Sequence, residues 1–283
     1  MTDHMNRSGI EVTSLEQQLL QTDDQEFIMA FLHRQKHVWK NQEMSDFVEN
    51  YFEKSLNTKD LSAALKQYLH QFRIHAEVDE TEVSFQGVRN QSPLMSDEFF
   101  RDLAFVYREQ LLVRESLQSF ENYLDDKLHC LNTWTKVTAV SFTAAAAISA
   151  VVAAAAAKGV RAAVAMGAGP ILFGAICTWM LALLKKHKNA VNIQKKIICF
   201  MIVGADIIIK DLSNVYALGR RLQFHTESLS EMVDEGAAEV AFRKKLVAFN
   251  ESFQELQCQS NDYGRDIHWA RAVVIQSIIH SNC

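Results

Sequence analysis

Two long uncharged segments in the middle of the chain constrain its fold more than any other feature. Residues 137–157 are 21 consecutive positions without a charged side chain, and residues 162–184 give 23 more after Lys158 and Arg161. Helices rise about 1.5 Å per residue, so each segment would be at least ~30 Å long as a helix. The hydrocarbon core of a bilayer is also ~30 Å thick. The sequence therefore predicts a transmembrane helical hairpin with its tip at 158–161.

The residues that flank these segments are of the kinds found where membrane helices enter the headgroup region. Tryptophan and lysine gather there because one end of each side chain is apolar and the other is polar. Lysine is more frequent on the side of the chain termini than at the tip, which predicts that both termini are cytosolic. The predicted anchoring flanks are Trp134, Lys136, Lys158, Arg161, Trp179, Lys185, Lys186 and Lys188.

The high alanine content of both segments leaves other interpretations open. Alanine contributes little to membrane insertion in comparison with Leu, Ile or Phe. A hairpin buried inside a soluble bundle is one alternative, and a bundle that shelters the hairpin until a trigger releases it, as in helical pore-forming proteins, is another. We favour constant spanning because soluble helices seldom run this far without a charge.

The composition of the whole chain favours long helices. The 283 residues include only 10 Gly and 2 Pro, and such a scarcity of helix breakers argues against a multi-stranded β fold. The net charge of −5 makes nucleic acid an unexpected partner. The five cysteines have no CxxC spacing and are expected to be reduced thiols. No apolar signal-peptide segment is expected in the first 25 residues.

Apolar residues recur at three- and four-residue steps through most of the remaining chain. One stripe runs from Phe99 to Leu131 into the first uncharged segment, a second from Ile197 to Leu229, and a third from Phe242 to Ile278. Such stripes favour packing as an antiparallel bundle. Gln110 is the polar exception in the first stripe. It either fixes the register of packing or lies at the surface, which is the commoner case.

We therefore predict an all-α fold, an elongated bundle of long antiparallel amphipathic helices with a central Ala-rich transmembrane hairpin. Asn57 and Thr58 predict a turn among the N-terminal helices, and Gly87 and Pro93 predict a loop. The expected segments are a disordered N-terminus (1–10), short helices (11–75), a loop (76–95), a coiled-coil-like helix (96–136), the hairpin (137–157 and 162–184), a long amphipathic helix (185–234) and a C-terminal helix (237–280).

No set of residues in the sequence has the spacing of a catalytic or metal-binding motif. His33 and His37 share a helical face, but no HExxH pattern and no third ligand accompany them, so we expect a solvated face. Asp125 and Asp126 are adjacent and point to different sides of a helix. No GxSxG nucleophile motif is present. The sequence predicts no catalytic residue, cofactor or metal, and favours a structural or interaction protein over an enzyme.

Short sequences spread over about residues 38–280 resemble a known family in their order and spacing. They are Phe47-Val48-Glu49-Asn50-Tyr51-Phe52-Glu53-Lys54-Ser55-Leu56 with Thr58 and Asp60; Phe99-Phe100, Val106-Tyr107 and Gln110; Leu128 and Leu131-Asn132-Thr133-Trp134-Thr135-Lys136-Val137; Ile209-Lys210-Asp211-Leu212; and Arg265-Asp266-Ile267, Ala270-Arg271 and Ile275-Gln276-Ser277-Ile278-Ile279. Together they resemble the plant-specific uncharacterised protein family 0496 (domain of unknown function 677), which includes the integrin-like membrane proteins of land plants. The chain departs from the family at the hairpin tip, where Lys158-Gly159 replaces the usual proline.

The resemblance implies a multi-pass protein of the plasma membrane, with two spans, that links the membrane to the cytoskeleton or cell wall and acts in stress or developmental signalling. It implies no catalytic residues. The expected partners are the lipid bilayer and proteins of unknown identity, either cytoskeletal proteins or another copy of the chain bound through the amphipathic helices.

Overall fold

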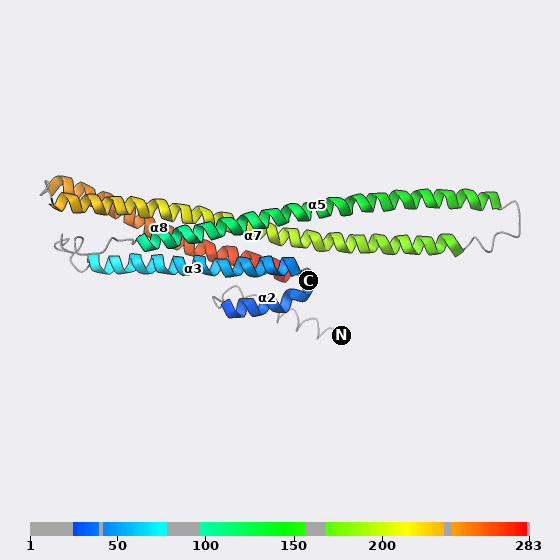
Figure 1. The fold of residues 1–283 in the computed structure, drawn as a ribbon, viewed down its shortest axis with the longest axis horizontal. Coiled ribbons are helices and arrows are strands. Elements are labelled where there is room, and N and C mark those ends of the chain that lie inside the picture. The colour runs from blue at the N-terminus through cyan, green and yellow to red at the C-terminus, as the bar shows by residue number, and fades with distance from the viewer. Residues whose placement is uncertain (1–24, 40–41, 78–96, 157–167, 235–238, 282–283) are drawn as a thin grey trace, which may run out of the picture. The chain divides into compact units, whose positions relative to one another are not determined.

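The structure is a computed structural model that describes residues 25–39, 42–77, 97–156, 168–234 and 239–281. For parts of these helices, including 142–156 and 168–177, only the backbone is described. The described ranges form five helices and no strand, which confirms the predicted all-α class within them. The helices are α2 (Gln25–Trp39), α3 (Gln42–Glu77), α5 (Asp97–Ala156), α7 (Ala168–Asp234) and α8 (Glu239–His280) (Figure 1).

The chain divides into two compact units. The first, which we call the core unit, consists of residues 1–118 and 199–283 and contains α2, α3, α8 and parts of α5 and α7. The second, the hairpin unit, consists of residues 119–198 and contains the remaining parts of α5 and α7.

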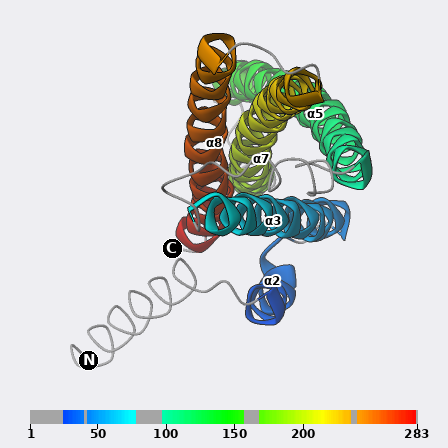
Figure 2. The same cartoon turned by 90° about the vertical axis from the view of Figure 1, so that its left-hand side faces the viewer.

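The predicted apolar stripes form the interior of the core unit. α3 packs on α8, and α2 lies on the side of α3 that faces away from α8 (Figure 2). Each buried Leu or Ile side chain contributes about 1.5–3 kcal/mol relative to an exposed one, so the stripes supply the main favourable term in folding. One continuous cluster draws on α3, α5, α7 and α8 and includes Leu61, Leu65, Phe99, Leu103, Ile208, Leu212, Val215, Phe253, Leu256 and Ile267.

The turn predicted at Asn57 and Thr58 is wrong, because α3 continues through both residues. The Thr58 hydroxyl donates to the Lys54 carbonyl oxygen one turn earlier, at 3.2 Å, as threonines within helices often do. The Asn57 amide donates to a Glu109 carboxylate oxygen of α5 at 2.8 Å. Both side chains that predicted a turn therefore make contacts compatible with a continuous helix.

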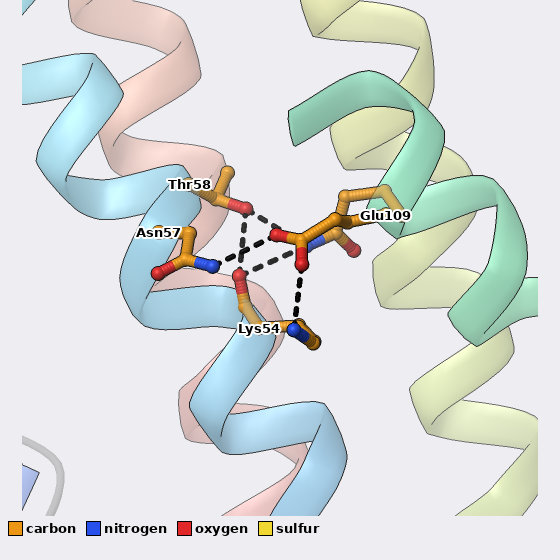
Figure 3. Close-up of polar contacts among 5 residues, drawn as sticks. Lys54, Asn57, Thr58 and Glu109 are labelled. Carbon is orange, nitrogen blue, oxygen red and sulfur yellow. Dashed lines mark hydrogen bonds and ion pairs between the residues drawn. The ribbon is translucent and has the colours of Figure 1, made fainter. Parts of the chain in front are cut away.

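Gln110 is buried, at 1% exposure, and it connects α5 to α3. Its Nε2 donates to Thr58 Oγ1 at 2.8 Å and to the Lys54 carbonyl oxygen at 3.1 Å. Beside it, Lys54 Nζ lies 2.6 Å from Glu109 Oε1 (Figure 3). Gln110 therefore does not lie at the surface. Its amide bonds α5 to α3, which agrees with the interpretation that it fixes the register of packing.

The transmembrane hairpin falls partly outside the described residues. Its tip, with Lys158 and Arg161, lies in 157–167, between the end of α5 at Ala156 and the start of α7 at Ala168. α7 then continues without a break through 185–188 to Asp234. Within the residues that the structure describes, no helix is both long enough and apolar enough to cross a membrane.

Candidate functional site

An ion pair between Asp125 and Lys195 marks the register of α5 against α7 in the hairpin unit. Asp125 Oδ1 lies 2.5 Å from Lys195 Nζ. The two helices run antiparallel (Figure 1), so positions equally far beyond Asp125 and before Lys195 lie at the same level. Trp134 is therefore level with Lys186, and Val140 is level with Met180.

Four lysines lie close to one level of this unit, and we call them the lysine collar. Lys136 comes from α5, and Lys185, Lys186 and Lys188 come from α7. The first three are exposed and Lys188 is partly exposed. Among the described residues, no carboxylate pairs with any of the four. The collar is therefore a group of uncompensated positive charges.

A band of exposed apolar side chains begins at the level of the collar and extends from there toward the tip on both helices; we call it the apolar belt. From α5 the belt takes Trp134, Val137 and Val140, and from α7 it takes Trp179, Met180 and Leu183; these six side chains are between 42% and 67% exposed. By the same register Val137 is level with Leu183. The belt runs over residues 134–140 of α5 and 179–183 of α7, or roughly 9 Å and 6 Å along the two helices.

The belt and collar contain six of the eight predicted anchoring residues. The other two, Lys158 and Arg161, lie outside the described residues. Sequence reasoning selected the tryptophans and lysines by residue type but did not single out Val137, Val140, Met180 and Leu183. Their signal was present in the sequence, because each lies three or four residues from another exposed belt residue and so on the same side of its helix.

Charge is distributed unequally between the two units. The hairpin unit has nine Lys and Arg against three Asp and Glu, a net of +6, although the whole chain carries −5. The core unit therefore carries 20 basic and 31 acidic residues, a net of −11. The positive unit is also the one that exposes the apolar belt.

A buried carboxyl group lies between α7 and α8 in the core unit. Asp211 is 6% exposed; its Oδ1 accepts a hydrogen bond from Gln259 Nε2 at 3.1 Å, and its Oδ2 has no partner in the described part of the chain. Burial, with the nearby Asp266 carboxylate, raises the pKa of Asp211 to about 6, and the hydrogen bond from Gln259 and the charge of Lys210 oppose this only in part. The fold thus brings together acids from two short sequences that predicted the family.

The other polar groups of the core unit are used in contacts between helices. Tyr263 of α8 donates its hydroxyl to the Thr58 carbonyl at 3.2 Å, and burial raises the pKa of Tyr263. Arg271 Nη1 donates to Ser55 Oγ at 2.9 Å, and its guanidinium lies over the Phe52 ring. Across the described ranges, no group of three or more His, Cys, Asp or Glu is arranged to hold a metal. His33 is exposed, and the side chain of His37 lies outside the description.

These features define a class of protein: an all-α bundle with a basic helical hairpin that exposes an apolar belt. The chain belongs to the family described as "Protein of unknown function (DUF677)", which matches residues 6–81 and 82–278. This confirms the family predicted from the short sequences.

Curated plant proteins are similar to the chain over most of their length. UPF0496 protein At4g34320 of Arabidopsis thaliana is 34% identical over 97% of this chain and 84% of its own. UPF0496 protein 1 of Oryza sativa subsp. japonica is 34% identical over 96% of this chain and 82% of its own. No solved structure matches the chain.

Proposed function

We propose that this protein is a membrane-anchored helical interaction protein whose hairpin unit inserts in a bilayer and whose core unit binds other proteins in the cytosol. The observation that carries the proposal is the apolar belt directly next to the lysine collar. Apolar area that is exposed to water is less stable by about 25 cal/mol per Å² than the same area when buried, and insertion in a bilayer would remove this cost. Tryptophan and lysine at the edge of the belt match the composition of a membrane–water interface.

The sequence beyond the belt supports the same proposal. The uncharged segments 137–157 and 162–184 begin and end within the belt and extend toward the tip without a charge. In the proposed arrangement they cross the bilayer twice, as a transmembrane hairpin. The collar lies on the side of the chain termini, so the positive-inside rule favours cytosolic termini.

The core unit supports an interaction role over an enzymatic one. The hydrogen-bonding groups of Gln110, Tyr263 and Arg271 are directed at neighbouring helices. Because these groups are bonded to other helices, they hold the helices together and are not available to bind a substrate. From the resemblance to integrin-like proteins, we further propose a plasma-membrane location, a link to the cytoskeleton or cell wall, and a role in stress or developmental signalling.

A second candidate is conditional insertion, in which the hairpin enters the membrane only after a trigger. The alanine content of the two uncharged segments favours it, because alanine adds little to the free energy of insertion. The two candidates differ in where the protein is found without a trigger.

Carbonate extraction of membranes from plant cells that express the tagged full chain tests the proposal. A constant anchor stays in the pellet, whereas a sheltered hairpin is washed into the supernatant. Substituting Val140→Lys places a charge in the belt and is expected to shift protein to the supernatant. The matched control is Val247→Lys on α8, which is also exposed, at 56%, but lies in the core unit and is expected to have no effect. Complete extraction of the unaltered chain would overturn constant anchoring.

A further inference from the structure

We infer that the lysine collar binds anionic phospholipid headgroups, so that the hairpin unit selects negatively charged membranes over neutral ones. The inference rests on the proposed membrane function and adds to it the class of lipid. It depends on the position of the collar, its lack of carboxylate partners and the charge of the hairpin unit.

The collar lies where headgroups would be if the belt were in lipid. Lys136 is two residues beyond Trp134, and Lys185 is two residues from Leu183, so the four charges lie within ~5 Å of the belt along the helix axis. The long apolar stems of lysine let the ammonium groups reach the headgroup layer while the stems cover apolar surface. The same four side chains thus contact both the edge of the apolar layer and the charged layer.

No acidic residue of the hairpin unit lies close enough to neutralise the collar. The three acids of this unit are Glu121, Asp125 and Asp126. By the register of the Asp125–Lys195 pair, Asp126 lies six residues or ~9 Å along the helix axis from the level of Lys188, the nearest collar lysine, and ten residues or ~15 Å from Lys136; Asp125 is paired with Lys195. The Debye length at physiological salt is ~8 Å, so these acids screen the collar only weakly.

The opposite charges of the two units mean that only the hairpin unit is attracted to an anionic membrane. The core unit carries −11 and is repelled by an anionic surface, whereas the hairpin unit carries +6 and is attracted to it. Each lysine near an anionic membrane strengthens binding by about fivefold. A nucleic acid would be attracted by the same charge, but the exposed belt directly next to the collar favours a lipid surface.

Flotation of the purified full chain with vesicles tests the inference. The vesicles contain phosphatidylcholine alone or phosphatidylcholine with added phosphatidylserine. We expect at least ~10-fold tighter binding to the anionic vesicles at physiological salt, and a smaller ratio at about 1 M salt, where the Debye length is ~3 Å. Equal binding to both vesicles would overturn the headgroup inference and leave membrane anchoring intact. Binding to neither would overturn the proposed anchoring and the inference together.

Two charge-matched variants assign the selectivity to the collar. The triple variant K185Q/K186Q/K188Q is expected to lose most of the preference for anionic vesicles and to keep binding to neutral ones. The control R108Q/K66Q/K244Q removes three exposed charges from the core unit and is expected to keep the preference. Equal loss in both variants would overturn the assignment to the collar. So would tight binding of random-sequence duplex DNA, without vesicles, that the collar variant abolishes.

Discussion

The side-chain amide of Gln110 on α5 donates a hydrogen bond to the hydroxyl of Thr58 on α3, 2.8 Å away, in the interior of the core unit. The carbonyl oxygen of the same Thr58 accepts a bond from Tyr263 of α8 at 3.2 Å. One residue of α3 therefore contacts two other helices through polar bonds. A slip of α3 along either neighbour would leave buried polar groups without partners, at about 1–3 kcal/mol for each group. These bonds fix the register of helices that apolar stripes alone would let slide.

Replacing Gln110 with alanine is expected to lower the free energy of unfolding of the protein by roughly 2–3 kcal/mol. The change leaves a cavity and removes the donor to Thr58 and to the Lys54 carbonyl. Urea unfolding followed by circular dichroism measures the effect. Gln118→Ala is the control, since Gln118 is an exposed glutamine on the same helix and should change the free energy by less than about 0.5 kcal/mol. Similar losses in both variants would show that the buried bonds do not matter.

Gly204 of α7 is expected to tolerate no larger residue, although alanine favours helices. A Cβ atom at this position would collide with the Tyr51 hydroxyl and lie 3.1 Å from the Ala270 Cβ, so three helices meet there at close range. Gly204→Ala should destabilise the core unit by about 1–3 kcal/mol through overpacking, despite a gain of up to ~1 kcal/mol in helix propensity. Thermal unfolding followed by circular dichroism measures the change.

The collision at Gly204 can be relieved by a second substitution. Tyr51 has a buried hydroxyl with no hydrogen-bond partner in the described residues, so Tyr51→Phe removes the colliding atom at little cost. The double variant G204A/Y51F should recover much of the lost stability. Gly264→Ala is the matched control: its nearest neighbour, at 2.6 Å, is the terminal nitrogen of Lys66, which can move. If G204A is as stable as G264A, the close approach is not a constraint.

Asp211→Asn is expected to stabilise the protein near pH 7.5 by roughly 1–3 kcal/mol and to leave it nearly unchanged below pH 4. Burial raises the pKa of Asp211 from 3.8 to about 6, so the folded state holds a proton that the unfolded state has released between these values. Protonated Asp211 therefore contributes to the stability of the folded state. This contribution is fully present below pH ~4 and is lost as pH rises through ~6. Urea unfolding between pH 4 and 8 measures it.

The control for this pH dependence is Asp206→Asn on the same helix. Asp206 is exposed and pairs with Arg114, and exposed ion pairs contribute about 0–1 kcal/mol. The groups that act on the pKa of Asp211 are Lys210 of α7 and Asp266 and Gln259 of α8, and Arg265 pairs with Asp266 at 3.9 Å. The charge of Asp211 in turn raises the pKa of Tyr263. A D211N profile that runs parallel to that of the unaltered chain would contradict the prediction.

Glu109→Gln is expected to act in the opposite direction with pH. Burial raises the pKa of Glu109, but the hydrogen bonds from Lys54 and Asn57 outweigh it and hold the pKa below its usual value of 4.5. The carboxylate therefore stabilises the fold above that value, and its contribution is lost as pH falls through the lowered pKa. The variant should cost about 1–2 kcal/mol at pH 7 and progressively less in acid. The same substitution at Glu255, whose pair with Arg221 is exposed, should cost less than about 1 kcal/mol.

The sequence by itself determined the helical class and the buried faces of α5 and α7. From Phe99 to Leu124, the predicted stripe positions of α5 are buried, Gln110 included, and those of α7 from Ile197 to Leu229 are buried as well. Helical periodicity is a local property, because residues three or four apart share a face whatever the rest of the chain does. The tryptophans and lysines of the collar and belt were readable from residue type alone, whereas the other four belt residues were not singled out.

Only the tertiary structure decided which residues meet across helices. Thr58 and Tyr263 are 205 residues apart, and no local pattern indicates that they bond. For the same reason, local preference predicted a turn at Thr58, whose polar groups bond to two other helices, and the proximity of Asp211 to Asp266 was not predicted. The common level of the collar lysines likewise followed only from the Asp125–Lys195 pair. Periodicity fixes the face that a helix buries, whereas the register between helices depends on contacts between residues far apart in the chain.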